Sequence, residues 1–432
     1  MRQAFLNARL LDPASGLDQT GGLIADGNRI AEFGPDITGD GLADDILMIN
    51  CHGHCLAPGL VDSRVRLGEP GEAHKETIAS ASAAAAAGGV TTMACLPDGP
   101  EPIDSMTGLE FIARRAREIK QTKIFAYACV TRQAKGKELA EMGLLAEAGA
   151  VGFTDGARAV ADALVLNRAL AYAGALGKPI IQHPEEPRLA MDGVMNAGEL
   201  STRLGLAGIP RQAEVMMIER DLRLVELTGA AYHVAHVSTA ESVAAIRHAK
   251  KSGLPVTCDT APTYFALTET DVGEYRTFAK LSPPLRSDED RRAIVEGLAD
   301  GTIDIIASDH WPQDVESKRL PFAQAEPGVV GLETLLQLAL ELAHKDQVSL
   351  LQILAAMTHK PAELIDQDLG RLTKGAPADL VLFELDRPGR IDVESFRSKS
   401  KNSPFDRRPT NGTVLATVVD GRTVYRADNF PD

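Results

Sequence analysis

The chain has 432 residues, a length that fits one large barrel with a smaller appended domain. Its 45 Lys and Arg residues stand against 60 Asp and Glu residues, and the formal net charge of -15 repels phosphate backbones and anionic lipids. Nucleic acid and membranes are therefore poor candidates as partners. The first residues lack the features of a signal peptide, and the five cysteines are scattered, so we expect a cytoplasmic protein with reduced thiols.

Strand patterns flank a long stretch in which short strands and helices alternate. Residues 1–56 alternate apolar and polar positions, which predicts short antiparallel strands, with turn signals at Asp12-Pro13, Asp26-Gly27 and Gly39-Asp40-Gly41. From residue 57 to 365, eight apolar runs alternate with helical stretches, which predicts an α/β fold, a (β/α)8 TIM barrel. Residues 366–432 return to strand-like alternation. We expect the two chain ends to form one small β-sandwich beside the barrel.

Two segments of this pattern have individual interpretations. The run Ala83–Ala87 is typical of a barrel helix that packs a small face against the strands. The stretch 311–328 is the longest connection without a clear period, and such loops at the carboxyl ends of barrel strands often form lids.

Four polar side chains end predicted barrel strands. They are Asp155 on strand 4, His183 on strand 5, His236 on strand 6 and Asp309 on strand 8. Two carboxylates and two imidazoles at one barrel mouth suit a divalent metal. Each residue alone has an ordinary explanation, because strand-end His residues often hydrogen-bond in the core and strand-end Asp residues often cap helices. Since all four fall at the same end of the barrel, we favour a functional site.

Linked segments along essentially the whole chain resemble dihydroorotases of the amidohydrolase superfamily. They include LAPGLVDSRVRLGEPG, GFTDG, IIQHPEEP, HVAHVSTAESV, SPPLRSDEDRRAIVEGLADGTIDIIASDHWP and SKSKNSPF. The resemblance implies a hydrolase of pyrimidine biosynthesis, in which two divalent metals activate a hydroxide that opens the cyclic amide of dihydroorotate. It implies that Asp155 bridges the metals, that His183 and His236 complete one metal's ligands, and that Asp309 contacts the second metal and acts as general base.

Strand 1 departs from this family pattern. Where the family has His-x-His and then Arg before Glu-Pro-Gly, this sequence has Arg64, Arg66 and Gly68. Arginine cannot replace a histidine ligand, because its guanidinium stays protonated and presents only donors. Gly68 lacks the planar fork that would bind a substrate carboxylate. Asp98 and Ser282 replace two asparagines, and the added carboxylate at position 98 would repel a dianionic substrate.

The two arginines have a physical interpretation from charge balance. Without metal, Asp155 and Asp309 would be unpaired carboxylates in a confined cavity, and Arg64 and Arg66 could pair with them at about 2.7 to 3.2 Å. The alternative is that both arginines simply reach solvent.

A second His-x-His lies in the segment Cys51–Cys55, ahead of the first barrel strand. Strand alternation would put His52 and His54 on one face, where they could bind an adventitious metal. The segment precedes the barrel, away from the strand ends, so we expect an exposed strand or linker without a functional metal.

Two functions remain open at this point. The resemblance favours a non-catalytic dihydroorotase-like chain, a pseudoenzyme that forms a homo-oligomer and assembles with the aspartate transcarbamoylase catalytic chain. We expect no binuclear zinc centre and at most one zinc ion, held by the residual set Asp155, His183, His236 and Asp309. The alternative is an active cyclic amidohydrolase that uses one metal on dihydroorotate or a related cyclic amide. Hydantoinase-like enzymes fit less well, since they generally carry lysine at the position of Asp155.

Overall fold

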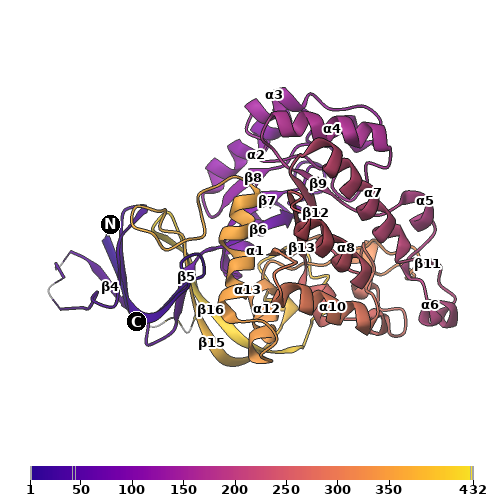
Figure 1. Ribbon diagram of the computed structural model, residues 1–432. Helices are drawn as coiled ribbons and strands as arrows, with labels where there is room; N and C mark the ends of the chain where they lie inside the picture. Colours follow the sequence, from indigo (N-terminus) through magenta and orange to yellow (C-terminus); the bar gives the residue numbers. More distant parts are fainter. Residues whose placement is uncertain (1, 41, 44, 429, 431–432) are drawn as a thin grey trace.

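Strands from both ends of the chain join in one sheet of eight strands (Figure 1). The structure is a computed structural model that describes residues 2–40, 42–43, 45–428 and 430. The strand order is β17-β16-β15-β5-β1-β2-β3, and β4 pairs with β1 off this path. The bounds are β1 Arg2–Asp12, β2 Leu17–Asp26, β3 Arg29–Gly34, β4 Leu47–Asn50, β5 Cys55–Pro58, β15 Leu380–Arg390, β16 Pro409–Val419 and β17 Arg422–Arg426.

The pairing of these strands departs in part from the prediction. β1, β2 and β3 are antiparallel as predicted, and β15 pairs antiparallel with β5, so the chain ends meet. However, β4 and β5 run parallel to β1, and the prediction of antiparallel strands is wrong there. β3 and β4 both run in the direction of β1, so the chain makes a crossover connection between them. A crossover connection allows the parallel pairing of β4 with β1. Gly41, in the third predicted turn, lies outside the described residues.

Eight parallel segments close into the predicted barrel. One set pairs β6, β7 and β8, and a second pairs β9, β12, β13 and β14. Isolated parallel bridges join the sets through Phe153, which pairs with Ala128 and Ile180, and through Val65, which pairs with His310. The bounds are β6 Leu60–Val65, β7 Val90–Cys95, β8 Lys123–Ala126, β9 Ile180–Gln182, β12 Tyr232–Val234, β13 Val256–Thr260 and β14 Ile305–Ile306. The TIM-barrel prediction is confirmed.

Helices surround the barrel strands (Figure 1). The predicted alanine-rich helix is α1, Ile78–Ala87, in which Ala81, Ala84, Ala85 and Ala86 are buried. The other α-helices are α2 Met106–Ile119, α3 Met142–Glu147, α4 Ala163–Ala175, α5 Pro187–Ala190, α6 Glu199–Leu204, α7 Gln212–Thr228, α8 Ala240–Lys251, α9 Pro262–Ala266, α10 Asp288–Ala299, α11 Val315–Lys318, α12 Leu335–His344, α13 Leu350–Met357 and α14 His359–Leu364. Short elements are β10 Met195–Asn196, β11 Gly208–Ile209 and the 3-10 helices Arg132–Ala134, Glu269–Val272, Thr277–Ala279 and Val393–Ser395.

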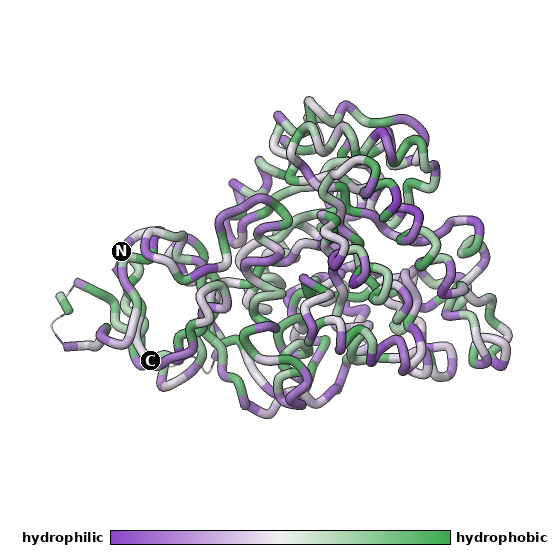
Figure 2. The backbone as a smooth tube through the Cα atoms, viewed as in Figure 1, coloured by the Kyte–Doolittle hydropathy of each residue, from purple (hydrophilic) through white to green (hydrophobic). Residues whose placement is uncertain are grey.

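The apolar core follows the barrel strands and the inner faces of the helices. Hydrophilic and hydrophobic residues alternate along the surrounding helices, as Figure 2 shows. The five cysteines are buried and unbridged. Among the helices that the structure describes, none has the length and apolar character needed to cross a membrane.

The long connection after strand 8 is held by the chain's closing segment. Asn402 donates from Nδ2 to the carbonyl oxygens of Trp311 and Gly328, at 3.0 Å each, and its Oδ1 accepts from the backbone N–H of Gln313 at 3.0 Å. One buried amide therefore ties both ends of the connection together and fixes Trp311 beside the barrel mouth.

Candidate functional site

Three of the four strand-end candidates contact one another at the barrel mouth. Nδ1 of His183 lies 2.7 Å from Nε2 of His236, and Nδ1 of His236 lies 3.1 Å from Oδ2 of Asp309. Asp155 makes different contacts: the backbone N–H of Thr131 donates to its Oδ1 at 2.9 Å, and the Thr131 hydroxyl donates to its Oδ2. Burial raises the pKa of Asp155 to about 6 despite these hydrogen bonds.

Arg64 lies inside this cluster. Its side chain is 1% exposed, its Nε donates to Oδ1 of Asp309 at 3.0 Å, and its Nη2 lies 3.4 Å from Nε2 of His236. The expected pair between Arg64 and Asp309 is therefore present, and the alternative that Arg64 reaches solvent is wrong. Burial opposes the charge of Arg64, but the surrounding carboxylates, led by Asp309, outweigh it and raise its pKa.

The protonation of His236 follows from these neighbours. Burial and then the charge of Arg64 lower the pKa of His236 to about 4, so the ring is neutral near pH 7. Burial opposes ionisation of Asp309, but His236 and Arg64 together lower its pKa, so its carboxylate stays charged. A neutral ring that donates from Nδ1 to Asp309 presents its Nε2 lone pair to two donors, His183 and Arg64.

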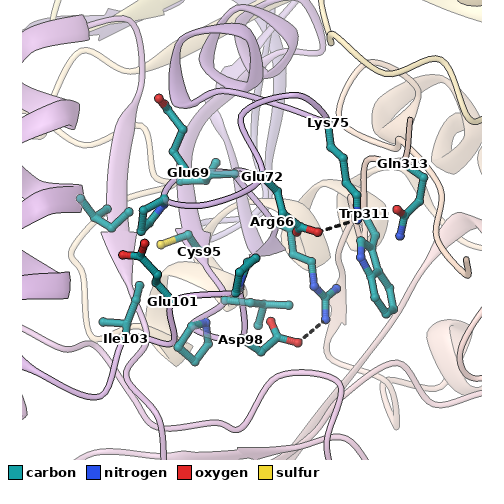
Figure 3. A pocket seen from close by; sticks show the side chains of 18 of the residues that line it. Arg66, Glu69, Glu72, Lys75, Cys95, Asp98, Glu101, Ile103, Trp311 and Gln313 are labelled. Carbon is teal, nitrogen blue, oxygen red and sulfur yellow. Dashed lines mark hydrogen bonds and ion pairs between the residues drawn. The ribbon is translucent and has the colours of Figure 1, made fainter. Parts of the chain in front are cut away.

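Arg66 has a different partner from the one expected. Its Nη2 donates to Oδ2 of Asp98 at 2.7 Å, and its guanidinium carbon lies 3.7 Å from the ring centroid of Trp311 (Figure 3). The expectation that it would pair with Asp155 or Asp309 is wrong. Because β6 ends at Val65, strand alternation no longer places Arg66 on the same face as Arg64. Arg66 does not reach solvent freely either, since its side chain is 12% exposed.

Asp98 is consequently not a lone carboxylate. Besides Arg66, the backbone N–H of Ala157 donates to its Oδ2 at 2.8 Å. Burial opposes ionisation, but Arg66 outweighs it and lowers the pKa of Asp98. The expected repulsion of an anionic substrate is thus reduced by the ion pair that Asp98 already makes.

Gly68 changes the backbone as well as the side chain. Its φ is +69°, in the left-handed region, and a Cβ placed there would lie 2.3 Å from the carbonyl oxygen of Glu76. An arginine therefore cannot occupy this position without a shift of the backbone.

Little space remains beside Asp309. The cavity there, which Ser282 and Trp311 also line, has a volume of about 10 Å³. That volume holds about one water molecule, whereas small-molecule sites usually measure about 300 to 1,000 Å³.

As they stand, the residues at the barrel mouth do not fit a divalent metal. The Nε2 lone pair of His236 faces His183 and Arg64, and the oxygens of Asp155 face Thr131. Within the described residues, no group of three or more His, Cys, Asp and Glu side chains is arranged to hold a metal ion. The expectation of at most one zinc stays a prediction for metal analysis.

The second His-x-His segment is not a strand. Residues 51–54 form a turn between β4 and β5, and His52 has a φ of +50°. The strand alternation that would align His52 with His54 is therefore absent.

Sequence reasoning missed three residues that shape the mouth: Thr131, Trp311 and Asn402. Trp311 is the chain's single tryptophan and stands two residues after Asp309, so its position was a usable signal. Asn402 belongs to the segment SKSKNSPF, which carried part of the family resemblance. Nothing in the local pattern around Thr131 indicated a contact with Asp155, because the pairing depends on how strands 3 and 4 sit side by side.

Comparison with known proteins places the chain in one family. A family model described as dihydro-orotase-like matches residues 53–242. The chain is 46% identical to the dihydroorotase of Anaplasma phagocytophilum (strain HZ) and 43% identical to that of Ehrlichia chaffeensis (strain ATCC CRL-10679 / Arkansas), and each match covers 98% of this chain and 95% of the relative.

Solved structures show the same barrel. The L-hydantoinase (dihydropyrimidinase) of Arthrobacter aurescens superposes with a TM-score of 0.87 at 26% identity, covering 98% of this chain and 96% of that chain. This lower identity reflects a shared amidohydrolase architecture, while the identity to the dihydroorotases is well above it over nearly the full length. The chain therefore belongs to the dihydroorotase family of the amidohydrolase superfamily.

Proposed function

We propose that this chain is a dihydroorotase-like protein of pyrimidine biosynthesis that catalyses neither the opening of dihydroorotate nor the closure of carbamoyl aspartate. One observation carries the proposal: the guanidinium of Arg64 lies buried between Asp309 and His236, at the position where the family has a histidine ligand. A guanidinium has no lone pair for a metal, and its positive charge disfavours a divalent cation beside it.

Arg64 also weakens the general base that hydrolysis would need. Water alone is too weak a nucleophile at neutral pH, so the reaction needs an activating group. Asp309, the family's general base, is bound to Arg64, and its lowered pKa makes it a poor proton acceptor.

Substrate binding is impaired independently of this loss. The space beside Asp309 is about 10 Å³, and the backbone at Gly68 excludes the family's arginine. A carboxylate substrate would therefore find little room beside Asp309 and no bidentate partner at position 68.

We further propose that the chain acts as a structural partner of the aspartate transcarbamoylase catalytic chain. The family resemblance supports this partner. The fold supports a surface role, because the barrel closes and the core is packed although the site has changed. His236 and Asp309 even keep left-handed backbone conformations, with φ of +35° and +49°, that cost roughly 1 to 3 kcal/mol each.

An assembly measurement tests this role. The purified chain is mixed at micromolar concentration and modest salt with aspartate transcarbamoylase catalytic chains from the same organism, and the mixture is sized by light scattering. We expect a large mixed assembly that an acidic monomeric protein of similar size does not form. Separate elution, together with unchanged transcarbamoylase activity after deletion of this chain, would contradict the role.

The alternative function is a cyclic amidohydrolase that works with one metal. The adjacent imidazoles of His183 and His236 are the observation that favours it, because they are two of the three ligands such a site needs. Dihydroorotate, hydantoin and dihydrouracil are offered as substrates with added zinc. Turnover of any of them that disappears in His183→Ala would establish this alternative in place of the proposed function.

A further inference from the structure

A second cavity is lined in part by the stacked pair Arg66 and Trp311. It measures about 370 Å³ and is lined by residues from the segments that follow β6 and β7 (Figure 3). Leu67, Leu96 and Ile103 contribute apolar surface to it. Its volume is that of a small-molecule site, in contrast to the space beside Asp309. We call this space the Asp98 cavity.

The walls of the Asp98 cavity are negatively charged. Five of its lining residues are acidic and three are basic, an excess of two negative charges. Two of the carboxylates are neutralised by ion pairs, Asp98 with Arg66 and Glu72 with Lys75. Glu101 makes no ion pair within the part of the chain that the structure describes. An anion would meet net repulsion here, and a cation would meet attraction.

An unsatisfied acceptor adds a specific contact point. Oδ2 of Asp98 receives both Arg66 and the backbone N–H of Ala157, while Oδ1 is buried and lacks a hydrogen-bond partner among the described residues. The Asp98 side chain is 9% exposed, and Figure 3 shows its carboxylate among the side chains that line the cavity. A buried carboxylate oxygen without a donor is costly, and a ligand N–H would remove that cost.

We infer that the Asp98 cavity binds a small amphipathic cation, an alkyl amine or alkyl guanidinium. Its charged head donates a hydrogen bond to Oδ1 of Asp98, and its apolar body packs on Leu67, Leu96 and Ile103. Dihydroorotate and carbamoyl aspartate are anions and do not match this chemistry. The inference deepens the proposed function and rests on it, because Gly68 and Asp98, two positions at which the family contacts its substrate, line this cavity. The binding test is separate from the turnover test, so the two proposals can fail independently.

Ligand binding in the Asp98 cavity can be followed by the fluorescence of Trp311. Trp311 is the single tryptophan, and it forms one wall of the Asp98 cavity. Intrinsic tryptophan fluorescence of the full-length chain therefore reports on this wall. The probe is butylguanidinium, and the control ligand is butylurea, which has nearly the same shape but no charge. We expect a saturable fluorescence change with butylguanidinium and none with butylurea.

Two variants and one control separate charge from space. Asp98→Asn removes the carboxylate, and we expect it to weaken butylguanidinium binding about tenfold. Asp386→Asn is the matched control, because it removes one exposed carboxylate that lies outside the cavity, and we expect no change in affinity. Gly99→Phe adds a large uncharged side chain at a residue that lines the cavity, and a Cβ there would meet only the carbonyl oxygen of Pro70, at 3.8 Å. We expect it to obstruct the cavity without changing its charge.

The outcomes are decisive in either direction. Binding that is selective for the cation, weakened by Asp98→Asn and abolished by Gly99→Phe supports the inference. Absence of a saturable change in the unmodified chain, or equal responses to butylguanidinium and butylurea, overturns it. Binding that persists in a folded Gly99→Phe variant also overturns it, because the ligand would then sit elsewhere. Tighter binding of carbamoyl aspartate at the same wall would overturn the charge preference.

Discussion

The two cavities that Trp311 helps to line differ in size. On the Asp309 side about 10 Å³ remains, and on the Asp98 side about 370 Å³ is open. The buried side chain of Arg64 takes up space on the first side, where it reaches Asp309.

The Asp309 side differs from the Asp98 side in its chemistry as well as in its space. Arg64 offers no lone pair to a metal, because a guanidinium only donates hydrogen bonds. Its side chain also takes up the space against Asp309 and His236. The positive charge of Arg64 also helps to keep the Asp309 carboxylate ionised and paired. The Asp309 side is thus a structural ion-pair network, and the Asp98 side keeps the features of a binding site.

The largest effect on stability should come from Arg64→Met, which keeps most of the side-chain volume but leaves the Asp309 carboxylate without its guanidinium. We expect a loss of about 3 kcal/mol in the free energy of unfolding, measured by urea denaturation. The loss arises because removing one partner of a buried ion pair leaves the other charge buried and unpaired. Arg9→Met is the matched control, since Arg9 and Asp18 form a two-bond pair at 39% and 36% exposure. Its loss should stay below about 1 kcal/mol. Equal losses would show that the Asp309 network is not structural.

Asp62, which lies on β6 two residues before Arg64, should make the stability of the fold depend on pH. Burial raises the pKa of this carboxyl from 3.8 to about 6, although the N–H groups of Arg64 and Ser308 donate to it. Between these values the folded chain holds a proton that the unfolded chain has lost, so this contribution to stability falls as pH rises. The fall amounts to at most about 3 kcal/mol.

Asp62→Asn tests that contribution, because an amide does not titrate in this range. The free energy of unfolding of Asp62→Asn should therefore depend less on pH between 4 and 6.5 than that of the unmodified chain. Denaturation curves across this window measure the difference. Parallel pH profiles would show that Asp62 ionises in the folded chain at its ordinary pKa.

A smaller loss is expected at Gly68, on the open side. Gly68→Ala should cost about 2 kcal/mol, because it combines a left-handed φ with a contact at 2.3 Å to the carbonyl oxygen of Glu76. Gly16→Ala measures the cost of the left-handed backbone alone, because Gly16 has a φ of +76° and an added Cβ would meet nothing within 4 Å. Thermal or urea unfolding of both variants gives the comparison. Equal losses would mean that the loop at Gly68 adjusts freely.

The sequence predicted the scaffold of this site better than its contacts. The eight apolar runs indicated the barrel, because each run is bounded by helical pattern, and charge balance indicated the pair between Arg64 and Asp309. The partner of Arg66 could not be predicted, because it depends on β6 ending at Val65 and on a tryptophan held by Asn402 from the far end of the chain. The parallel direction of β4 and β5 could not be predicted either. It depends on a crossover connection, and the alternation of apolar and polar residues does not indicate strand direction.

The smallest effect is expected on turnover when both replaced ligands are restored. Arg64→His with Arg66→His should recover metal binding, measured by metal analysis, but little hydrolysis of dihydroorotate. Gly68, Asp98 and Ser282 still deny the substrate its contacts in that variant. Robust turnover by the double variant would show that strand 1 alone separates this chain from an active enzyme.

The most direct test measures dihydroorotate hydrolysis, carbamoyl aspartate cyclisation and metal content on one purified sample of the unmodified chain, with and without added zinc. We expect no detectable turnover in either direction and at most one metal ion per chain, because Arg64 is buried against Asp309 and His236. Substantial turnover, or two metal ions bound per chain, would contradict the proposal that this dihydroorotase-family chain is non-catalytic.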